Sequence, residues 1–371
     1  MSIDGEDMPD FLRARRDGLR FSHGFATRTG GFEEWRAEGL ALLRAAVGPA
    51  LDGEAAVEEL GRAGHAGGLR LRLRAVFPTG AATEALMLLP AGAGPHPAVL
   101  LLHDHGSEFA IGKEKLVTPW DDPPRAAEAA AWQARLYDGV SLGEALLARG
   151  FAVLAADALG WGSRRGNGYA AQQALAANLM QFGLSLAGVI AAEDAQLAGW
   201  LARHPAVDAR RLAVLGFSFG GYRAWQAMAL CPGLAAGMAI GWMGRLADLM
   251  RPGGNQLRGQ SAFCMLHPSL GGRLDYPDVA GLAAPRPVQF LSGRRDPHFP
   301  AATAAAAFGD LRRIWRAAGA PRALDTGLDD AGHVFTAGQQ ARAFAFLERS
   351  LPALDPRPDA PRQRARPDSV G

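Results

Sequence analysis

The amino-acid sequence predicts an α/β protein built on a mostly parallel, doubly wound sheet. Short apolar runs of strand length, at 98–102, 151–156 and 212–215, alternate with segments of helix length. The runs are apolar throughout, which is typical of strands covered by helices on both faces. With 371 residues and a hydrophobic fraction of 49%, the chain can bury a large core.

Composition narrows the class of protein. The formal net charge is +2, so no charge excess favours nucleic acid or an anionic membrane as a partner. Cys231 and Cys264 are too few for a disulfide framework, and residues 1–10 are acidic without the apolar core of a signal peptide. We therefore expect a cytoplasmic protein. The uncharged run 166–192 is of membrane-spanning length, but its Asn and Gln residues favour a buried or cleft-lining helix.

The first part of the chain predicts an extension followed by the start of the sheet. Residues 1–30 show no periodicity, and we expect an extended arm there. Apolar residues at helical spacing over 32–47, ended by Gly48-Pro49, predict an amphipathic helix. Residues 69–77 and 85–89 predict an antiparallel hairpin. We divide the chain into an N-terminal arm and helix (1–66), a main domain (67–351) and a disordered, Pro- and Arg-rich tail (352–371).

The middle of the chain predicts two insertions that cover the carboxyl edge of the sheet. Strand 98–102 ends in His103-Asp104-His105-Gly106, after which an insertion runs from 107 to 138. Helix 142–149 and strand 151–156 then lead to a helix over 170–202, broken or bent near Gly183 and Gly188. Beyond the segment 211–221, we expect strands at 235–242 and 287–292 and helices at 301–318 and 339–350.

The segment 211–221 carries the clearest motif. An apolar strand ends in Gly216-Phe217-Ser218-Phe219-Gly220, and a helical segment follows. Small residues two positions on either side of Ser218 allow strand and helix to pass closely, so that the Ser218 hydroxyl is lifted out of the sheet. This context predicts a nucleophilic serine at the N-terminus of a helix; an ordinary tight turn is the alternative.

A serine hydroxyl needs a base, and the base needs a partner that holds its tautomer. Asp296 follows the strand at 287–292, and His333 lies in a loop before the last helix. The order Ser218, Asp296, His333 predicts a catalytic triad. Rival candidates are the acids Asp325, Asp329 and Asp330 and the imidazoles His103, His105, His267 and His298, and a lone surface histidine is the alternative for His333.

These motifs resemble those of the α/β-hydrolase fold, and within it the serine esterases of the dienelactone-hydrolase-like and acetyl-xylan-esterase-like bacterial branch. The resemblance covers residues 98–335 and rests on five features. These are His103-Asp-His-Gly106, the segment 157–164, Gly216-Phe-Ser-Phe-Gly-Gly221, the lead 284–287 into the strand before Asp296, and Gly332-His333. It implies an esterase with a Ser-Asp-His triad. Dienelactone hydrolases proper carry Cys where this chain has Ser218.

The remaining site residues follow from position. Backbone N–H groups of Phe219 and of His105 and Gly106 are expected to form the oxyanion hole. The loop 103–106 could instead hold a metal ion, but adjacent strand residues point to opposite faces, so we expect no metal. Trp161 and Trp242 follow strands at the edge where ligands bind, and each either lines the substrate pocket or packs in the core.

Two pairs of charged residues have plainer interpretations. Glu193 and Asp194 precede the motif on a helix and are expected on a solvated or salt-bridged face. Arg164 and Arg165 could hold an acidic substrate or support the loop after strand 151–156, and we favour the structural role.

The sequence thus predicts a hydrolase of small-molecule carboxylic esters that acts through an acyl-enzyme and needs no cofactor. A lyase, an acyltransferase or a cofactor-free peroxidase on the same fold is the alternative, since fold does not fix chemistry. A non-catalytic binding protein is disfavoured because serine, acid and base occur in order.

Overall fold

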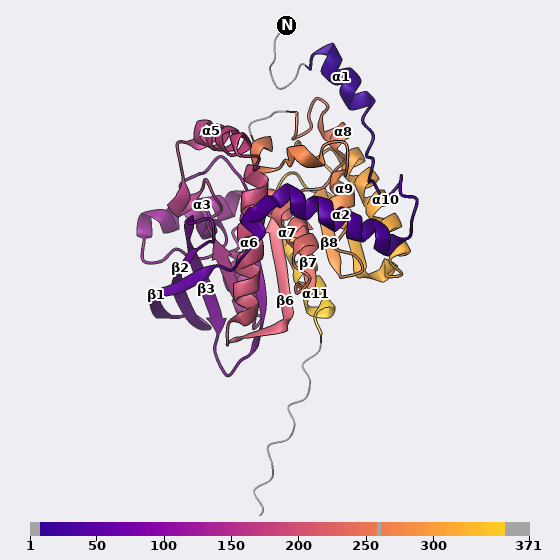
Figure 1. Ribbon diagram of the computed structural model, residues 1–371. Helices are drawn as coiled ribbons and strands as arrows, with labels where there is room; N and C mark the ends of the chain where they lie inside the picture. Colours follow the sequence, from indigo (N-terminus) through magenta and orange to yellow (C-terminus); the bar gives the residue numbers. More distant parts are fainter. Residues whose placement is uncertain (1–7, 258–260, 353–371) are drawn as a thin grey trace, which may run out of the picture.

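The computed structural model describes residues 8–257 and 261–352, and across these ranges it contains one sheet of nine strands (Figure 1). The strands lie in the order β1-β2-β3-β5-β4-β6-β7-β8-β9. The neighbours from β5 through β4 to β9 pair in parallel, whereas β1, β2, β3 and β5 pair antiparallel. The predicted mostly parallel sheet is confirmed. The strand bounds are β1 Ala56–His65, β2 Gly68–Val76, β3 Ala82–Pro90, β4 His96–Leu102, β5 Ala152–Ala156, β6 Val207–Phe217, β7 Ala236–Ile240, β8 Val288–Gly293 and β9 Leu324–Asp329.

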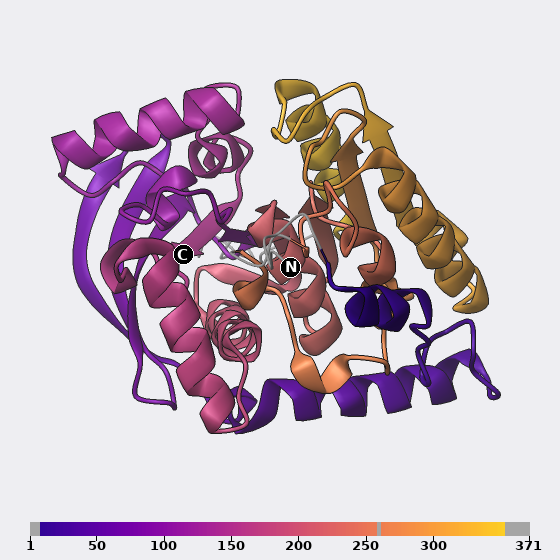
Figure 2. The same cartoon turned by 90° about the horizontal axis from the view of Figure 1, so that it is seen from above.

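Helices cover both faces of the sheet, as a doubly wound fold requires. In Figure 2 the long helix α2 lies on one side of the sheet, and α3 and α11 lie on the other. Helices α6, α7, α9 and α10 share the side of α2, and α4 shares the side of α11. The helix bounds are α1 Asp10–Asp17, α2 Phe32–Val47, α3 Pro123–Leu136, α4 Leu142–Leu147, α5 Gly168–Gln181, α6 Leu186–Arg203, α7 Phe219–Leu230, α8 Leu246–Leu249, α9 Tyr276–Gly281, α10 Ala301–Ala317 and α11 Ala337–Ser350.

The central strands are apolar throughout because they contribute side chains to two separate cores. In β4, Leu100 and Leu102 belong to the larger core under α6 and α7. Val99 and Leu101 belong to the core under α4 and α11. Successive side chains of a strand point to opposite faces of the sheet. Because helices cover both faces here, the side chains on each face must be apolar.

Several elements differ from the expectations. The arm at 1–30 contains the helix α1, and strands β1 and β9 were not predicted. Strand β1 pairs with β2 along its whole length, so the sheet begins at Ala56 and not at residue 67. Its side chains are exposed or half-buried and none is buried, which leaves little apolar signal to detect. Most of the expected tail, at 353–371, lies outside the described residues.

The N-terminal helical extension packs against the main domain. Helix α2 has the predicted bounds and lies against α6 and α7. Trp35 of this helix is buried, meets the Phe25 ring edge-on at 4.9 Å, and donates its indole N–H to the carbonyl of His23 at 2.9 Å. The segment before α2 is therefore held in place by an aromatic anchor.

The long helix expected at 170–202 is two helices. The break falls at Gly183, which has a φ of 73°, whereas Gly188 lies inside α6. Of the described residues, no single helix is long and apolar enough to cross a membrane; only α5 and α6 counted together, bent by 90°, reach that length. Helix α6 is buried over most of its length, whereas α5, which makes up most of the uncharged run 166–192, has only Gln172 and Ala176 buried. The expectation of a buried helix therefore holds for the α6 part of the run alone.

Candidate active site

Strand β6 and helix α7 meet at Ser218, whose backbone has φ 54° and ψ −121°. This left-handed conformation is strained for a residue with a side chain, and such strain is concentrated at functional sites. The crossing is possible because Gly216 and Gly220 have no side chain. A Cβ at Gly216 would lie 2.1 Å from the Gly220 carbonyl oxygen, and one at Gly220 would lie 1.9 Å from that of Leu102. The predicted sharp turn is confirmed.

Ser218, His333 and Asp296 form one hydrogen-bonded chain. His333 Nε2 lies 2.8 Å from Ser218 Oγ, and His333 Nδ1 lies 2.7 Å from Asp296 Oδ2. Ser218 comes from the β6–α7 turn, Asp296 from the loop after β8, and His333 from the loop between β9 and α11. The structure thus brings together the three residues that the sequence singled out.

The second oxygen of Asp296 is held by backbone. Asp296 Oδ1 accepts hydrogen bonds from the N–H groups of His298 at 2.8 Å and Phe299 at 3.1 Å, and the residue is 5% exposed. Two hydrogen bonds from backbone N–H groups fix the orientation of a carboxylate. The carboxylate is therefore aimed at His333.

The rival acids bond elsewhere. Asp325 bonds to Gln289 and Arg342, Asp329 accepts a hydrogen bond from Gln339, and Asp330 lies 3.3 Å from Arg295. Asp330 and Arg295 are both exposed, so their pair is solvated. The geometry thus favours Asp296 over the two acids on the loop of His333.

A cavity of about 370 Å³ opens at Ser218 and His333. His105 and Gly106 line it, so the loop expected to supply oxyanion donors borders the same space as the Ser218 hydroxyl. Trp242 also lines the cavity. Trp161 does not, and here the pocket expectation is wrong: Trp161 is fully buried and donates its indole N–H to the carbonyl of His105 at 2.8 Å.

The side chains of the loop after β4 point to separate partners. His103 Nε2 accepts from the N–H of Ala158 at 3.1 Å, and His105 Nε2 lies 3.1 Å from the amide oxygen of Gln172. Burial lowers the pKa of His105 to about 4, so its imidazole is neutral near pH 7. In the described parts of the chain, no three His, Cys, Asp or Glu side chains converge as metal ligands.

Lys115, which the sequence pattern did not mark as a site residue, contacts the backbone of this loop. Its ammonium is fully buried and donates to the carbonyls of His105 at 2.9 Å and Asp104 at 3.2 Å. It also lies 3.6 Å from Asp104 Oδ2. Burial lowers the pKa of Lys115, and the Asp104 carboxylate opposes that shift. Lys115 therefore fixes the backbone that borders the cavity.

Asp104 is the negative partner of Lys115 and is itself 1% exposed. Its Oδ1 accepts from the Tyr137 hydroxyl at 2.5 Å and from the Trp132 indole N–H at 3.2 Å. Burial raises the pKa of Asp104, but Lys115 and Tyr137 lower it by more, so the group stays ionised. Helix α3 and the segment after it are thereby tied to the loop.

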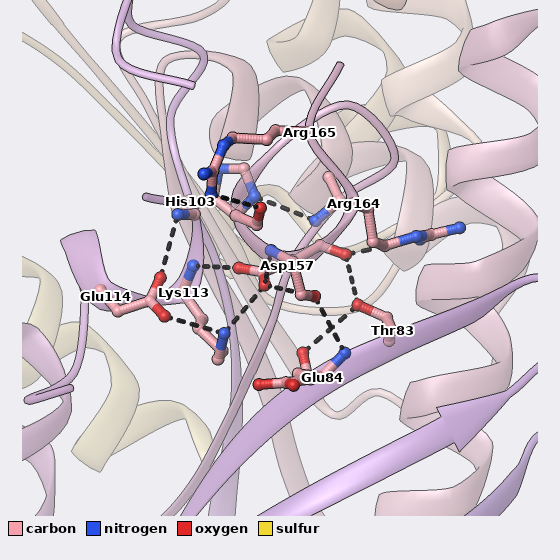
Figure 3. A network of polar contacts seen from close by, with 12 residues as sticks. Thr83, Glu84, His103, Lys113, Glu114, Asp157, Arg164 and Arg165 are labelled. Atoms are coloured by element: carbon pink, nitrogen blue, oxygen red, sulfur yellow. Dashed lines mark hydrogen bonds and ion pairs between the residues drawn. The ribbon is translucent and has the colours of Figure 1, made fainter. Parts of the chain in front are cut away.

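Lys113 holds a second buried network, shown in Figure 3. The Asp157 carboxylate accepts from the Lys113 ammonium and backbone N–H, each at 2.8 Å, and from the Ser163 hydroxyl. Glu114 lies 2.8 Å from the same ammonium. Burial raises the pKa of Asp157, but Lys113 lowers it by more. The network joins the insertion after β4 to the loop after β5.

The acidic pair on α6 is buried and paired. Glu193 forms a two-bond ion pair with Arg164, and Asp194 forms one with Arg223 of α7. Of the two expected alternatives, the salt-bridged face is found and the solvated face is not: Glu193, Asp194 and Arg223 are each 2–3% exposed. Arg164 supports the loop after β5, as expected.

The sequence offered one signal for the lysines. Lys113 and Lys115 are the only lysines in an arginine-rich chain. An ammonium is a compact donor that can contact several carbonyls at one point, which a planar guanidinium cannot do in the same space.

Comparisons with known proteins agree with this architecture. No family model matches the chain. Putative hydrolase YtaP of Bacillus subtilis (strain 168) is 26% identical over 264 residues, which cover 70% of this chain and 80% of that protein. The crystal structure of a putative acetyl xylan esterase from Bacteroides fragilis NCTC 9343 superposes with a TM-score of 0.67 at 14% identity, over 88% of this chain and 85% of that one.

A glucuronoyl esterase from Solibacter usitatus superposes with a TM-score of 0.62 at 15% identity, over 90% of this chain and 96% of that one. These likenesses extend over most of each chain and show the fold. The protein therefore has the α/β-hydrolase fold.

Proposed function

We propose that this protein is a serine hydrolase of carboxylic esters, with Ser218 as nucleophile, His333 as general base and Asp296 as the acid that orients it. The hydrogen-bonded chain from Ser218 Oγ to Asp296 Oδ2, open to a cavity, carries the proposal. The names of the similar structures, which include acetyl xylan and glucuronoyl esterases, support ester hydrolysis over the other reactions of the fold.

The chemistry follows from the positions of these groups. Ser218 Oγ attacks the ester carbonyl carbon while His333 Nε2 takes the hydroxyl proton. The negative charge that forms on the carbonyl oxygen is stabilised by the backbone N–H of Phe219 and by an N–H of the His105 to Gly106 loop. His333 then protonates the departing alcohol, leaving an acyl group on Ser218. Water, deprotonated by His333, attacks the acyl carbon and releases the acid.

The cavity bears on the substrate. A volume of about 370 Å³ lies at the small end of ligand sites and suits short acyl groups. Trp242 and Phe299 supply apolar walls beside His333. We therefore expect acetyl or similarly short esters, including those of sugar hydroxyls, to be better substrates than lipids.

The test combines labelling with turnover. A fluorophosphonate probe is expected to label the wild-type protein but not Ser218→Ala, and aryl acetate hydrolysis is expected to fall to at most about a thousandth. A circular dichroism spectrum controls for folding. Labelling of a folded Ser218→Ala variant, or retention of more than a tenth of the activity, contradicts the assignment. Labelling of Ser218 without release of acid from any ester would instead favour acyl transfer or another reaction.

A further inference from the structure

The cavity at Ser218 carries a guanidinium that the proposed mechanism does not use. Arg135 lies in the last turn of α3 and is the sole Arg or Lys among the described residues that line the cavity. Within the described ranges, no carboxylate pairs with it, although Arg125 of the same helix lies near Glu114 and Asp122. An exposed arginine without an ion pair at a cavity wall is free to bind a ligand.

Arg135 is held at the cavity by an aromatic platform. Its guanidinium lies 4.1 Å from the centre of the Trp132 ring, which also lines the cavity. Trp132 is 6% exposed, and its indole N–H is bonded to Asp104, so the platform is fixed. A guanidinium held over a tryptophan ring keeps the N–H groups at its own edge free, and these can bind a carboxylate with two parallel bonds.

The other charges at the site are balanced. The Asp104 carboxylate lines the cavity, but it is buried beside the Lys115 ammonium. Asp296 lies on the Nδ1 side of His333, away from Ser218. His105 is neutral near pH 7. Among the residues that the structure describes, the charge that remains open to a ligand in the cavity is that of Arg135.

We propose that the natural substrate is an ester with a carboxylate group remote from the scissile bond, and that Arg135 binds this carboxylate. This proposal rests on the proposed ester hydrolysis. Arg135 is then a specificity-determining residue. Bidentate pairing gives both energy and orientation, whereas the exposure of Arg135 limits the gain through solvent screening. We expect a preference of about tenfold in kcat/KM, weakened by salt.

The test uses a rigid pair of aryl acetates, 4-acetoxybenzoate and 4-acetoxybenzamide. They have nearly the same shape and differ in one charge, and the para carboxylate cannot reach the ester to react with it. The ratio of their kcat/KM values is measured for the wild type and for Arg135→Gln, Arg135→Lys and Arg316→Gln. Comparing ratios between variants cancels the difference between the two leaving groups. Arg316 is an exposed arginine of α10 outside the cavity and controls for the loss of one charge.

We expect the ratio to fall about tenfold in Arg135→Gln, to be partly kept in Arg135→Lys, and to be unchanged in Arg316→Gln. In the wild type it should decline between 20 mM and 500 mM NaCl, because salt screens exposed charges. Equal ratios in the wild type and Arg135→Gln overturn the proposal.

A binding measurement tests the carboxylate site at Arg135 independently of the proposed ester hydrolysis. The Kd of 4-hydroxybenzoate, measured by calorimetry on the wild type and Arg135→Gln, is expected to rise about tenfold in the variant, while that of 4-hydroxybenzamide does not. If neither acetate is hydrolysed, ester hydrolysis fails and the Kd values still decide the role of Arg135. If both acetates are hydrolysed and the Kd of 4-hydroxybenzoate is the same in both proteins, the carboxylate site fails alone.

Discussion

Replacing Lys115 by Met tests whether the loop behind the cavity is held by a buried charge. Methionine has a similar length and fills the same space without an ammonium. The change removes the donor to the carbonyls of Asp104 and His105 and leaves the Asp104 carboxylate, which is 1% exposed, without its cation. We expect a large loss of stability from this one substitution.

The expected loss of stability follows from the burial of the Lys115–Asp104 ion pair. Removing one partner of a buried ion pair typically costs about 3–5 kcal/mol, because the other charge stays buried without compensation. At about 2.1 cal/mol/K per residue, the unfolding entropy of 371 residues is roughly 0.8 kcal/mol/K. The melting temperature of Lys115→Met should therefore fall by about 4–6 °C.

The assay is calorimetric melting at pH 7, with a double variant as the internal comparison. Asp104→Asn removes the unbalanced charge, yet its amide oxygen can still accept from Tyr137 and Trp132. The double variant Asp104→Asn/Lys115→Met should thus melt above Lys115→Met. The reasoning is refuted if Lys115→Met melts within about 1 °C of the wild type, or if the double variant melts no higher than Lys115→Met.

Four further predictions follow from the site and its surroundings. Asp296→Asn should lose most ester turnover, by analogy with the roughly 10⁴-fold loss when a triad acid is replaced by its amide, whereas Asp330→Asn should keep it; the reverse pattern in initial rates would exclude Asp296. Gly106→Val should lower kcat, because a Cβ there would lie 2.2 Å from the Trp132 ring on a backbone with φ 47°; unchanged turnover would count against the oxyanion loop. Rates on aryl acetate, butyrate, octanoate and palmitate should decline with chain length, and fastest turnover of palmitate would disprove a narrow pocket. Burial raises the pKa of Asp275 from near 4 to about 7, so between these values the folded protein keeps a proton that the unfolded chain has lost, and stability falls as pH rises. In Asp275→Asn, the free energy of unfolding, measured by urea denaturation, should fall less between pH 5 and pH 7.5 than it does in the wild type. An equal fall in both proteins would contradict the raised pKa of Asp275.

The sequence predicted those parts of the fold whose pattern is strong. Uniformly apolar strands such as β4 and β5 were found, as was helix α2 with its bounds. The edge strands β1 and β9 were missed because neither is strongly apolar: β1 is largely exposed, and β9 is half-buried along its length. Edge strands depend on pairing with a neighbour, which the local sequence does not record.

The candidate site also contains residues that the sequence could predict and residues that it could not. The structure brings Ser218, Asp296 and His333 together, and the sequence singled them out because each lies in a loop whose place in the chain order is diagnostic. The side chains that hold the site are identified only by three-dimensional contacts. Trp161 shows the difference: its position after a strand suggested a pocket wall, but its ring is buried against Phe219 with centroids 5.3 Å apart.

The buried charges around the site share one arrangement. Lys115 with Asp104, Lys113 with Asp157, Arg164 with Glu193 and Arg223 with Asp194 each join a loop or helix next to the cavity to a different element. Apolar contacts could supply comparable stability, since buried ion pairs gain little net free energy over well-packed apolar residues. Ion pairs differ from apolar contacts because they fix the relative position of the two elements that they join. If one partner is displaced, the other is left as an unpaired buried charge. In the proposed mechanism, backbone N–H groups stabilise the reacting oxygen. Positioning of this kind then matters, because a displaced loop can no longer aim its donors at that oxygen.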